Sequence, residues 1–430
     1  MSLRNRSALL TLPGWSNVDS WLNVIQSSAN LQAITDLLSS NIWVLAKLRT
    51  QNSKGIALEK TGVRFVIWFS NRSSYITSSF KTAVHMARFI LIVQKLMPRS
   101  LSLQAIEFAC QTRILGLGEI VTNPENSAEF AKVWPVVMTD INSICSLSQP
   151  RDRQFASLLV DSNLSSLYHG TLDIEAQDSP DPELLKLFSK SRKTIFATTP
   201  RQVEKYQIDY EVPGDEIRKV SPPRHEKYLD AGSFPDVAKV VGPIVLFMTR
   251  SPAEFRGFSY LSSVRAITRV ISSIGRAGGG RLCVMSHPNE GRIGVYLRIF
   301  LGFLYALPLN VSVHLTDKSV HEYKDLGIAL TWFTGLTVDF AILGVPAYEL
   351  RSGKSPVLGP PNTEREPFDM IYAAGLCQRI LSEEELQQTL LFPNSSDAVG
   401  RARRAYQKEF FQVPKSTESV ARAIEDLLQQ

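Results

Sequence analysis

The chain has 430 residues, of which 44% are hydrophobic and 20% are charged, and its formal net charge is +6. This length favours two domains, and this composition indicates a globular protein and excludes a disordered one. No run of lysine and arginine resembles a nucleic-acid-binding tail, so we expect no nucleic acid partner, whereas the mild positive charge fits an anionic small ligand or an acidic membrane surface.

In the first half of the chain, short apolar runs rich in β-branched and aromatic residues predict strands, and amphipathic runs predict helices. The predicted strands are Ile42–Leu48, Arg64–Ser70, Val133–Met138, Phe155–Val160, Thr194–Thr199 and one that starts at Ser165 and runs into His169-Gly170-Thr171. The predicted helices are Val18–Ile25, Leu31–Leu38, Phe80–Leu96, Leu103–Leu115, Glu183–Ser191 and one that begins with Pro200, a favourable first-turn residue.

Residues 213–243 are rich in proline, glycine and charge, as inter-domain linkers are, and we place the domain boundary near Tyr228–Pro235. A second alternation of strands and helices follows. Its predicted strands are Ile244–Thr249, Arg281–Ser286, Val311–Leu315 and Ile328–Thr331. Its predicted helices are Phe258–Ser273, Ile293–Ala306, Val320–Leu326 and Leu336–Leu343, and the tail adds Pro367–Ala374, Glu383–Phe392, Ala398–Phe411 and Thr417–Leu428.

Strands that alternate with helices predict parallel, doubly wound sheets. We therefore expect an α/β fold of two doubly wound, Rossmann-like domains that face each other across a cleft, with a helical C-terminal tail. The expected domains are residues 1–230 and residues 231–430.

The cysteines and the apolar segments bear on the compartment. The four cysteines lie far apart in apolar surroundings, so we expect no metal cluster and a reducing compartment. The N-terminal apolar run is short and is broken by Pro13 and Gly14, which makes a poor signal peptide. The segment Ile293–Leu309 carries Arg298 and is too short to span a bilayer. We therefore predict a cytoplasmic protein.

The segment Thr331–Leu350 predicts a strand end, a small-residue turn, a short helix that stops at Gly344, and another strand. Thr334 and Thr337 occupy positions typical of a helix N-cap. Gly335 between them permits a close approach of a ligand to the backbone. Because a helix start collects N–H donors and the positive end of the helix dipole, this segment suits a phosphate.

Ligands of open α/β sheets bind beyond the carboxyl ends of the strands. In the second half, the residues at these ends are Arg250, Ser251, His287, Pro288, Asn289, Glu290, Thr316, Asp317, Thr334 and Gly335. In the first half they are His169, Gly170, Thr171, Thr198 and Thr199. A cation, two imidazoles and several hydroxyls are typical of a site for a phosphate ester.

Each of these residues also has a structural interpretation. Arg250 can pair with Glu254 one turn further on, and either His169 or His287 can be a structural histidine. Asp339 lies in the first turn of its helix, where a carboxylate stabilises the dipole without binding any ligand.

Five short motifs follow one another between residues 155 and 350. They are Tyr168-His169-Gly170-Thr171, Ser221-Pro222-Pro223-Arg224-His225, Ser286-His287-Pro288, Thr334–Ala341 and Leu343-Gly344-Val345-Pro346. Through these motifs the chain resembles the GT-B fold glycosyltransferases. The narrower resemblance is to the bacterial surface-polysaccharide group that includes CDP-glycerol glycerophosphotransferases and CMP-sugar-dependent sialyltransferase-like and capsule enzymes.

The resemblance implies a metal-independent, cofactor-free glycosyltransferase of bacterial cell-envelope or capsule polysaccharide biosynthesis. It would move a sugar from a nucleotide-sugar donor to a surface-polysaccharide or lipid-linked glycan acceptor. His287 would stabilise the leaving phosphate and His169 would act as the base on the acceptor hydroxyl. The residues implied in donor binding are Arg250, His287, Pro288, Glu290, Thr334, Gly335, Thr337 and Asp339. Peripheral association with the inner face of the membrane stays open.

Three alternatives remain. A CDP-glycerol-type polyol-phosphate transferase would form a phosphodiester, with His169 activating the acceptor. A non-hydrolysing nucleotide-sugar epimerase is expected to share the fold, but its acidic residues have no clear place in this sequence. A non-catalytic GT-B-like binding protein would explain why Thr334-Gly335 stands where the resembled motif has two serines.

Overall fold

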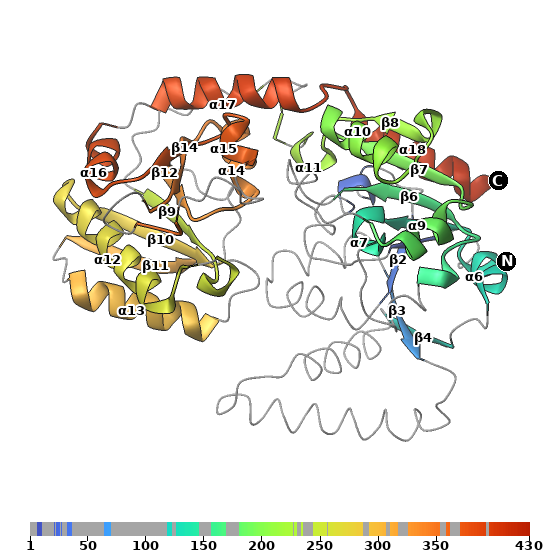
Figure 1. Ribbon diagram of the computed structural model, residues 1–430, viewed down its shortest axis with the longest axis horizontal. Coiled ribbons are helices and arrows are strands. Elements are labelled where there is room, and N and C mark those ends of the chain that lie inside the picture. Colours follow the sequence, from blue (N-terminus) through green and yellow to red (C-terminus); the bar gives the residue numbers. More distant parts are fainter. Residues whose placement is uncertain are drawn as a thin grey trace. The chain divides into compact units, whose positions relative to one another are not determined.

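The structure is a computed structural model of residues 1–430, and part of the chain is described. The described residues are 7–10, 21, 23–25, 27, 32–36, 64–69, 118–122, 126–145, 156–168, 180–226, 228–229, 234, 244–255, 257–286, 292–306, 310–316, 326–352, 358–361, 370–392 and 395–430. They divide into two units (Figure 1). The first holds the described residues up to Glu226 together with residues 411–430, and the second runs from Tyr228 to Phe410.

The first unit is built on an eight-stranded sheet in which every pair of neighbouring strands is parallel. The strand order is β4-β3-β2-β1-β5-β6-β7-β8. The strands are β1 (Ser7–Leu10), β2 (Gln32–Asp36), β3 (Arg64–Phe69), β4 (Gly118–Thr122), β5 (Val136–Thr139), β6 (Asn163–Leu167), β7 (Lys193–Ala197) and β8 (Ile217–Lys219). The helices are α6 (Ser127–Val133), α7 (Ile141–Cys145), α9 (Pro182–Phe188), α10 (Pro200–Ile208), α11 (Pro223–Glu226) and α18 (Ser416–Gln429), with a 3-10 turn η3 (Gly214–Glu216).

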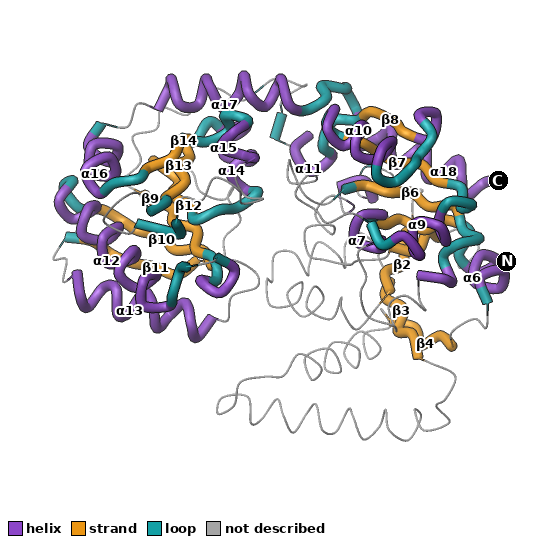
Figure 2. The backbone as a smooth tube through the Cα atoms, viewed as in Figure 1, coloured by secondary structure: helices purple, strands orange, loops and turns teal. Residues whose placement is uncertain are grey.

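The second unit is built on a six-stranded parallel sheet with the order β11-β10-β9-β12-β13-β14. The strands are β9 (Ile244–Thr249), β10 (Gly280–Ser286), β11 (Val311–Thr316), β12 (Leu326–Thr331), β13 (Ala347–Leu350) and β14 (Gln378–Ile380). The helices are α12 (Tyr260–Arg276), α13 (Arg292–Ala306), α14 (Leu336–Leu343), α15 (Met370–Ala373), α16 (Glu383–Leu391) and α17 (Ser395–Glu409), with a 3-10 turn η4 (Pro252–Glu254). This order is that of the Rossmann fold, with the first strand in the middle (Figure 2).

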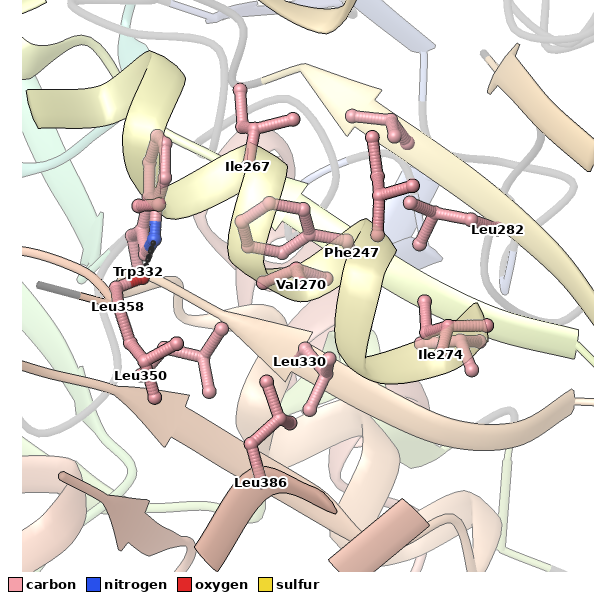
Figure 3. Packing of buried hydrophobic residues seen from close by; sticks show 14 of the residues in the cluster. Phe247, Ile267, Val270, Ile274, Leu282, Leu330, Trp332, Leu350, Leu358 and Leu386 are labelled. Carbon is pink, nitrogen blue, oxygen red and sulfur yellow. Dashed lines mark hydrogen bonds between the residues drawn. The ribbon is translucent and has the colours of Figure 1, made fainter. Parts of the chain in front are cut away.

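Alternating side chains of the second sheet form two apolar layers. On one face Phe247, Leu330 and Trp332 pack with residues of α12, α13 and α16, as Figure 3 shows in part. On the other face Leu246 and Ala329 pack with Phe340 of α14. Strands that are buried on both faces read as continuous apolar runs, which explains why β9 was predictable from the sequence to the residue.

The prediction of an α/β fold with parallel, doubly wound sheets and a helical C-terminal tail is confirmed. The helix Leu336–Leu343 is also confirmed, and Gly344 ends it in the left-handed conformation with φ 77°. That the two units face each other across a cleft stays a prediction.

Two predicted elements are wrong. Leu31–Leu38 was predicted to be a helix, but Gln32–Asp36 form β2, because pairing with β1 and β3 outweighs the ambiguous local pattern. Phe155–Val160 was predicted to be a strand, but its described residues form a helical segment and a turn in which Ala156 and Leu159 are buried. The predicted elements Ile42–Leu48, Phe80–Leu96 and Leu103–Leu115 lie outside the described residues. The predicted helix Val320–Leu326 also lies outside them except for Leu326, which begins β12.

The C-terminus differs from the predicted domain ranges. Residues 411–430 were predicted to belong to the second domain, but α18 packs against β1 and β5 of the first sheet. Val420 and Ile424 of α18 share one apolar core with Leu10. The predicted linker also contains β8, which is the edge strand of the first sheet.

Segment 221–226 joins α18 to the first unit by hydrogen bonds. The Ser221 hydroxyl donates to the carbonyl of Phe411 at 2.7 Å. The Glu226 carboxylate accepts from the backbone N–H of Ser416 at 3.0 Å and of Thr417 at 2.7 Å. Because these N–H groups start α18, Glu226 caps that helix from a distant part of the sequence.

Among the described residues, no helix is long and apolar enough to cross a membrane.

Candidate functional site

The order of the second sheet reverses between β9 and β12. The chain continues from β9 to β10 on one side, whereas β12 and β13 lie on the other. Arg250 directly follows β9, and the segment Trp332–Gly335 directly follows β12. Because β9 and β12 are parallel neighbours, both segments leave the sheet at the same edge, where ligands of doubly wound folds bind.

The turn between β12 and α14 is fixed by Trp332. This side chain is fully buried and its indole N–H donates to the carbonyl of Leu358 at 3.1 Å (Figure 3). Its ring lies edge-on to Phe247 and Phe258, with centroids 5.1 Å away in both cases. The next residue, Phe333, has φ 148°, a conformation that only glycine adopts freely. A backbone strained in this way persists only where the surrounding structure fixes it. The buried and hydrogen-bonded side chain of Trp332 fixes the residue before Phe333.

Arg250 lies over the ring of Phe333, with its guanidinium carbon 5.0 Å from the ring centroid. The arginine after β9 and the strained turn after β12 are therefore in contact. This contact brings together two of the segments that sequence analysis selected, Arg250 and the Thr334–Asp339 segment.

The start of α14 is organised by its own threonines. The Thr334 hydroxyl accepts from the backbone N–H of Leu336 at 3.3 Å, and the Thr337 hydroxyl donates to the Thr334 carbonyl at 2.8 Å. Gly335 is the N-cap residue, rather than Thr334 or Thr337 as the sequence suggested. Thr337 is 2% exposed, so its hydroxyl supports the turn from inside.

Asp339 lies in the first turn of α14 and is 5% exposed. Asp339 is one of the buried residues of α14, and this helix packs on α17. Arg403 of α17 donates to the carbonyls of Ala341 and Ile342 at 3.2 and 3.1 Å, and so caps the opposite end of α14. The predicted role of Asp339 in donor binding stays a prediction.

A buried charge cluster that was not predicted from the sequence lies at the ends of β13 and β14. Glu349 pairs with Arg351 and with Arg379, each at 2.8 Å, and Glu349 and Arg351 are 2% and 1% exposed. Arg379 also lies over the ring of Tyr372, 4.1 Å from its centroid. This cluster places two arginines and one carboxylate at the ends of the two strands that follow α14. Glu349 within the apolar run Ala347–Leu350 was the available signal, because a charge in a buried strand requires a partner.

The other predicted site residues fall into two groups. His169, Gly170, Thr171, His287, Pro288, Asn289, Glu290 and Asp317 lie outside the described residues. Thr199 is described, and its hydroxyl accepts from the backbone N–H of Gln202 at 3.1 Å, so it caps α10. In the part of the chain that the structure describes, no group of three or more histidines, cysteines or acids is placed to hold a metal ion.

The first sheet reverses its order between β1 and β5, and a buried polar cluster follows β5. Asp140 accepts from the backbone N–H and from the side-chain amide of Asn142, both at 3.0 Å. That amide also donates to the Tyr206 hydroxyl at 2.8 Å, and Asp140 and Tyr206 have no exposed surface. Burial, and then the Asp140 charge, raise the pKa of Tyr206 well above its usual value.

Cys145, at the end of α7, lies near this cluster. Burial and the charge of Asp140 raise the pKa of its thiol to about 12. A thiol with such a pKa stays protonated and unreactive near neutral pH. Cys145 is therefore a structural residue.

No protein-family model matches the chain, and no curated protein matches it. Among solved structures, the chain is similar to the UDP-GlcNAc 2-epimerase from Neisseria meningitidis bound to UDP-GlcNAc, with a TM-score of 0.51 and 11% identity over 98% of this chain and 99% of that chain. It is also similar to a glycosyltransferase from Rickettsia africae, with a TM-score of 0.47 and 9% identity over 99% and 100% of the two chains.

At these identities the similarity shows the fold alone. The assignment of the fold rests on the epimerase structure, whose TM-score is 0.51. The protein has the GT-B-like fold, which consists of two Rossmann-like α/β units. A fold does not decide an activity, which depends on the residues of the site.

Proposed function

We propose that the protein is a nucleotide-sugar-dependent glycosyltransferase that binds its donor diphosphate at the carboxyl edge of the second sheet. One observation carries the proposal: Arg250 and the start of α14 meet through Phe333 at the point where the order of this sheet reverses. A cation beside a helix N-terminus offers both a positive charge and oriented dipoles to a phosphate.

The neighbouring strand end adds positive charge. Arg351 follows β13, and adjacent strands of a sheet lie about 4.8 Å apart. Arg351 and Arg379 both contact Glu349, and Arg250 lies at a nearby strand end, so arginines gather at this edge. Arginines suit an anionic ligand such as a phosphate.

The same groups suit the chemistry of glycosyl transfer. As the bond between the sugar and the phosphate breaks, negative charge grows on the nucleotide. Arg250 and the N-terminal dipole of α14 would stabilise that charge without reorganisation, because Trp332 holds their turn rigid. In the proposed reaction His287, which follows β10 in the sequence, assists the departure of the phosphate, and His169 accepts the proton of the acceptor hydroxyl.

The proposal is tested by nucleotide binding. We expect at least one of UDP, CDP, CMP and GDP to raise the melting temperature of the protein, because a ligand of the native state stabilises it. Arg250→Ala should lower the affinity of the protein for that nucleotide about tenfold or more, because a charge-assisted contact to the phosphate is lost. Arg422→Ala on α18, an arginine whose side chain is 77% exposed, is the matched control and should bind normally.

Product analysis then separates the proposed reaction from its alternatives. A glycoside supports transfer of the sugar, a phosphodiester supports polyol-phosphate transfer, and a changed sugar with no acceptor supports an epimerase. If no nucleotide shifts the melting temperature, the donor site is refuted and a binding protein without this activity is favoured.

A further inference from the structure

Helix α13 is apolar on its exposed side as well as on its buried side. Val295 and Ile299 face the core of the second unit. On the opposite side of the helix large apolar side chains reach solvent: Tyr296 (56% exposed), Leu297 (49%), Phe300 (58%), Leu304 (44%) and Tyr305 (73%). Surface helices of soluble proteins normally carry polar residues on that side.

Helix α12 extends this apolar face and holds it in place. Leu261 of α12 is 57% exposed, and the Tyr260 hydroxyl donates to the carbonyl of Gly294 in α13 at 3.1 Å. The two helices pack so closely that a Cβ added to Gly302 would lie 2.6 Å from the Ile267 side chain. We call the exposed residues Leu261, Tyr296, Leu297, Phe300, Leu304 and Tyr305 the α12–α13 surface; α12 and α13 are labelled in Figure 1.

The apolar residues are concentrated on this surface. Tyr260 of α12 is also exposed, at 43%. In the described part of the chain, the exposed large hydrophobic residues outside α12 and α13 are spread over several elements: Ile208, Tyr372, Leu391, Phe392 and Val413. Scattered single residues need no explanation, but a contiguous apolar patch on a folded unit indicates an interaction site.

The surroundings of the α12–α13 surface are basic. From Tyr260 to Thr316 the sequence holds six arginines and one acidic residue, Glu290, which belongs to neither helix. Arg265 is exposed one turn after Leu261, and α13 begins with Arg292. Arg269 and Arg276 pair with Glu383 of α16, and Arg298 is buried against aromatic rings. No carboxylate of α12 or α13 offsets the charge around the surface.

We propose that the α12–α13 surface binds the surface of an anionic lipid bilayer, with α13 lying in the plane of the interface. Aromatic and leucine side chains that enter the headgroup region, flanked by arginines that meet anionic headgroups, are the arrangement of interfacial helices. The 15 residues of α13 make a helix of about 22 Å, which is long enough to lie on a bilayer and too short to cross it.

A second copy of this chain fits the surface less well. A two-fold interface would join two copies of a face whose helices carry arginines and no acidic residues, so neither copy of α12 or α13 could supply a carboxylate to pair with them. Lipid phosphates supply the missing negative charge. The inference does not depend on the proposed sugar transfer, because it uses a different face and no nucleotide.

The test is co-sedimentation of the full chain with vesicles. We expect the protein to bind vesicles of phosphatidylcholine with phosphatidylglycerol better than vesicles of phosphatidylcholine alone, and to be released by salt. The double variant Phe300→Ser/Tyr305→Ser should lower the partition coefficient at least about tenfold, because it removes two aromatic side chains from the interface. Arg265→Glu should weaken binding to the anionic vesicles in particular.

The matched control is Ile208→Ser, which removes a 67% exposed isoleucine from α10 of the first unit and should bind as the wild type does. The proposal is overturned if the wild type binds neither vesicle, or if the double variant binds as well as the wild type. It is also overturned if light scattering reveals a wild-type dimer that the double variant separates, since the surface would then be a subunit interface.

Discussion

The two sheets carry opposite chemistry at equivalent positions. Both have their first strand in the middle, and both reverse their order beside it. At this place the second sheet presents Arg250 and the start of α14, held by the apolar anchor Trp332. The first sheet instead presents the buried carboxylate of Asp140, held by hydrogen bonds from Asn142.

This difference separates what topology decides from what side chains decide. Topology places a ligand-binding edge in each unit, but the sign of the charge there depends on a few residues. A positive edge favours a phosphate, which is the basis of the donor site proposed in the second unit. Asp140 has no exposed surface, so its carboxylate organises the first edge from inside.

The largest effect is expected from removing the apolar anchor. Trp332→Ala should lower the free energy of unfolding by about 3–5 kcal/mol, because it empties a fully buried tryptophan site. It should also abolish the nucleotide-induced rise in melting temperature, since the β12–α14 turn loses its support.

Trp134→Ala removes an equally buried tryptophan from the first unit and is the matched control. It should destabilise the protein but leave the nucleotide response in place. Equal loss of that response in both variants would contradict the assignment of the donor to the second sheet.

A smaller effect is expected from the polar cluster of the first sheet. Asp140→Ala should cost about 2 kcal/mol of unfolding free energy, because it leaves two buried donors of Asn142 without their acceptor. Asp140→Asn keeps one acceptor and should cost less. Denaturant titration measures both, and nucleotide affinity should stay that of the wild type. A nucleotide affinity that falls with Asp140→Ala would show that the two edges do not act separately.

The smallest effect is a pH dependence. The folded-state pKa of Cys145 is raised from 9.0 to about 12, so its contribution to stability is complete below pH 9 and is lost as pH rises from 9 towards 12. At pH 10 the Cys145 thiol should lower the free energy of unfolding by about 1 kcal/mol relative to pH 8. Urea titrations at both values should show a shallower loss for Cys145→Ala than for the wild type, and identical losses would contradict the raised pKa.

Local signals explain which elements were predictable. The start and end of α14 follow from the small residues before Leu336 and from Gly344, so its bounds needed no long-range information. β2 depends on pairing with two other strands, and its apolar residues also fit a helix. The amphipathic pattern predicts α18, but it does not say which sheet the helix covers.

The candidate site divides in the same way. Arg250 and Thr334–Asp339 were selected because they follow apolar strands directly in the sequence. The cluster of Glu349, Arg351 and Arg379 joins two strands, and Asn142, the partner of Asp140, donates to Tyr206 far along the chain. Such partners become visible only when the strands are placed side by side.

The position of α18 has a consequence for synthesis on the ribosome. This helix follows the whole of the second unit in the chain, yet its Val420 and Ile424 share one apolar core with β1, which precedes that unit. Until Ser416 emerges and meets Glu226, the core around β1 lacks the apolar side chains that α18 contributes. The second unit, whose residues end at Phe410, can therefore fold before the first one is finished.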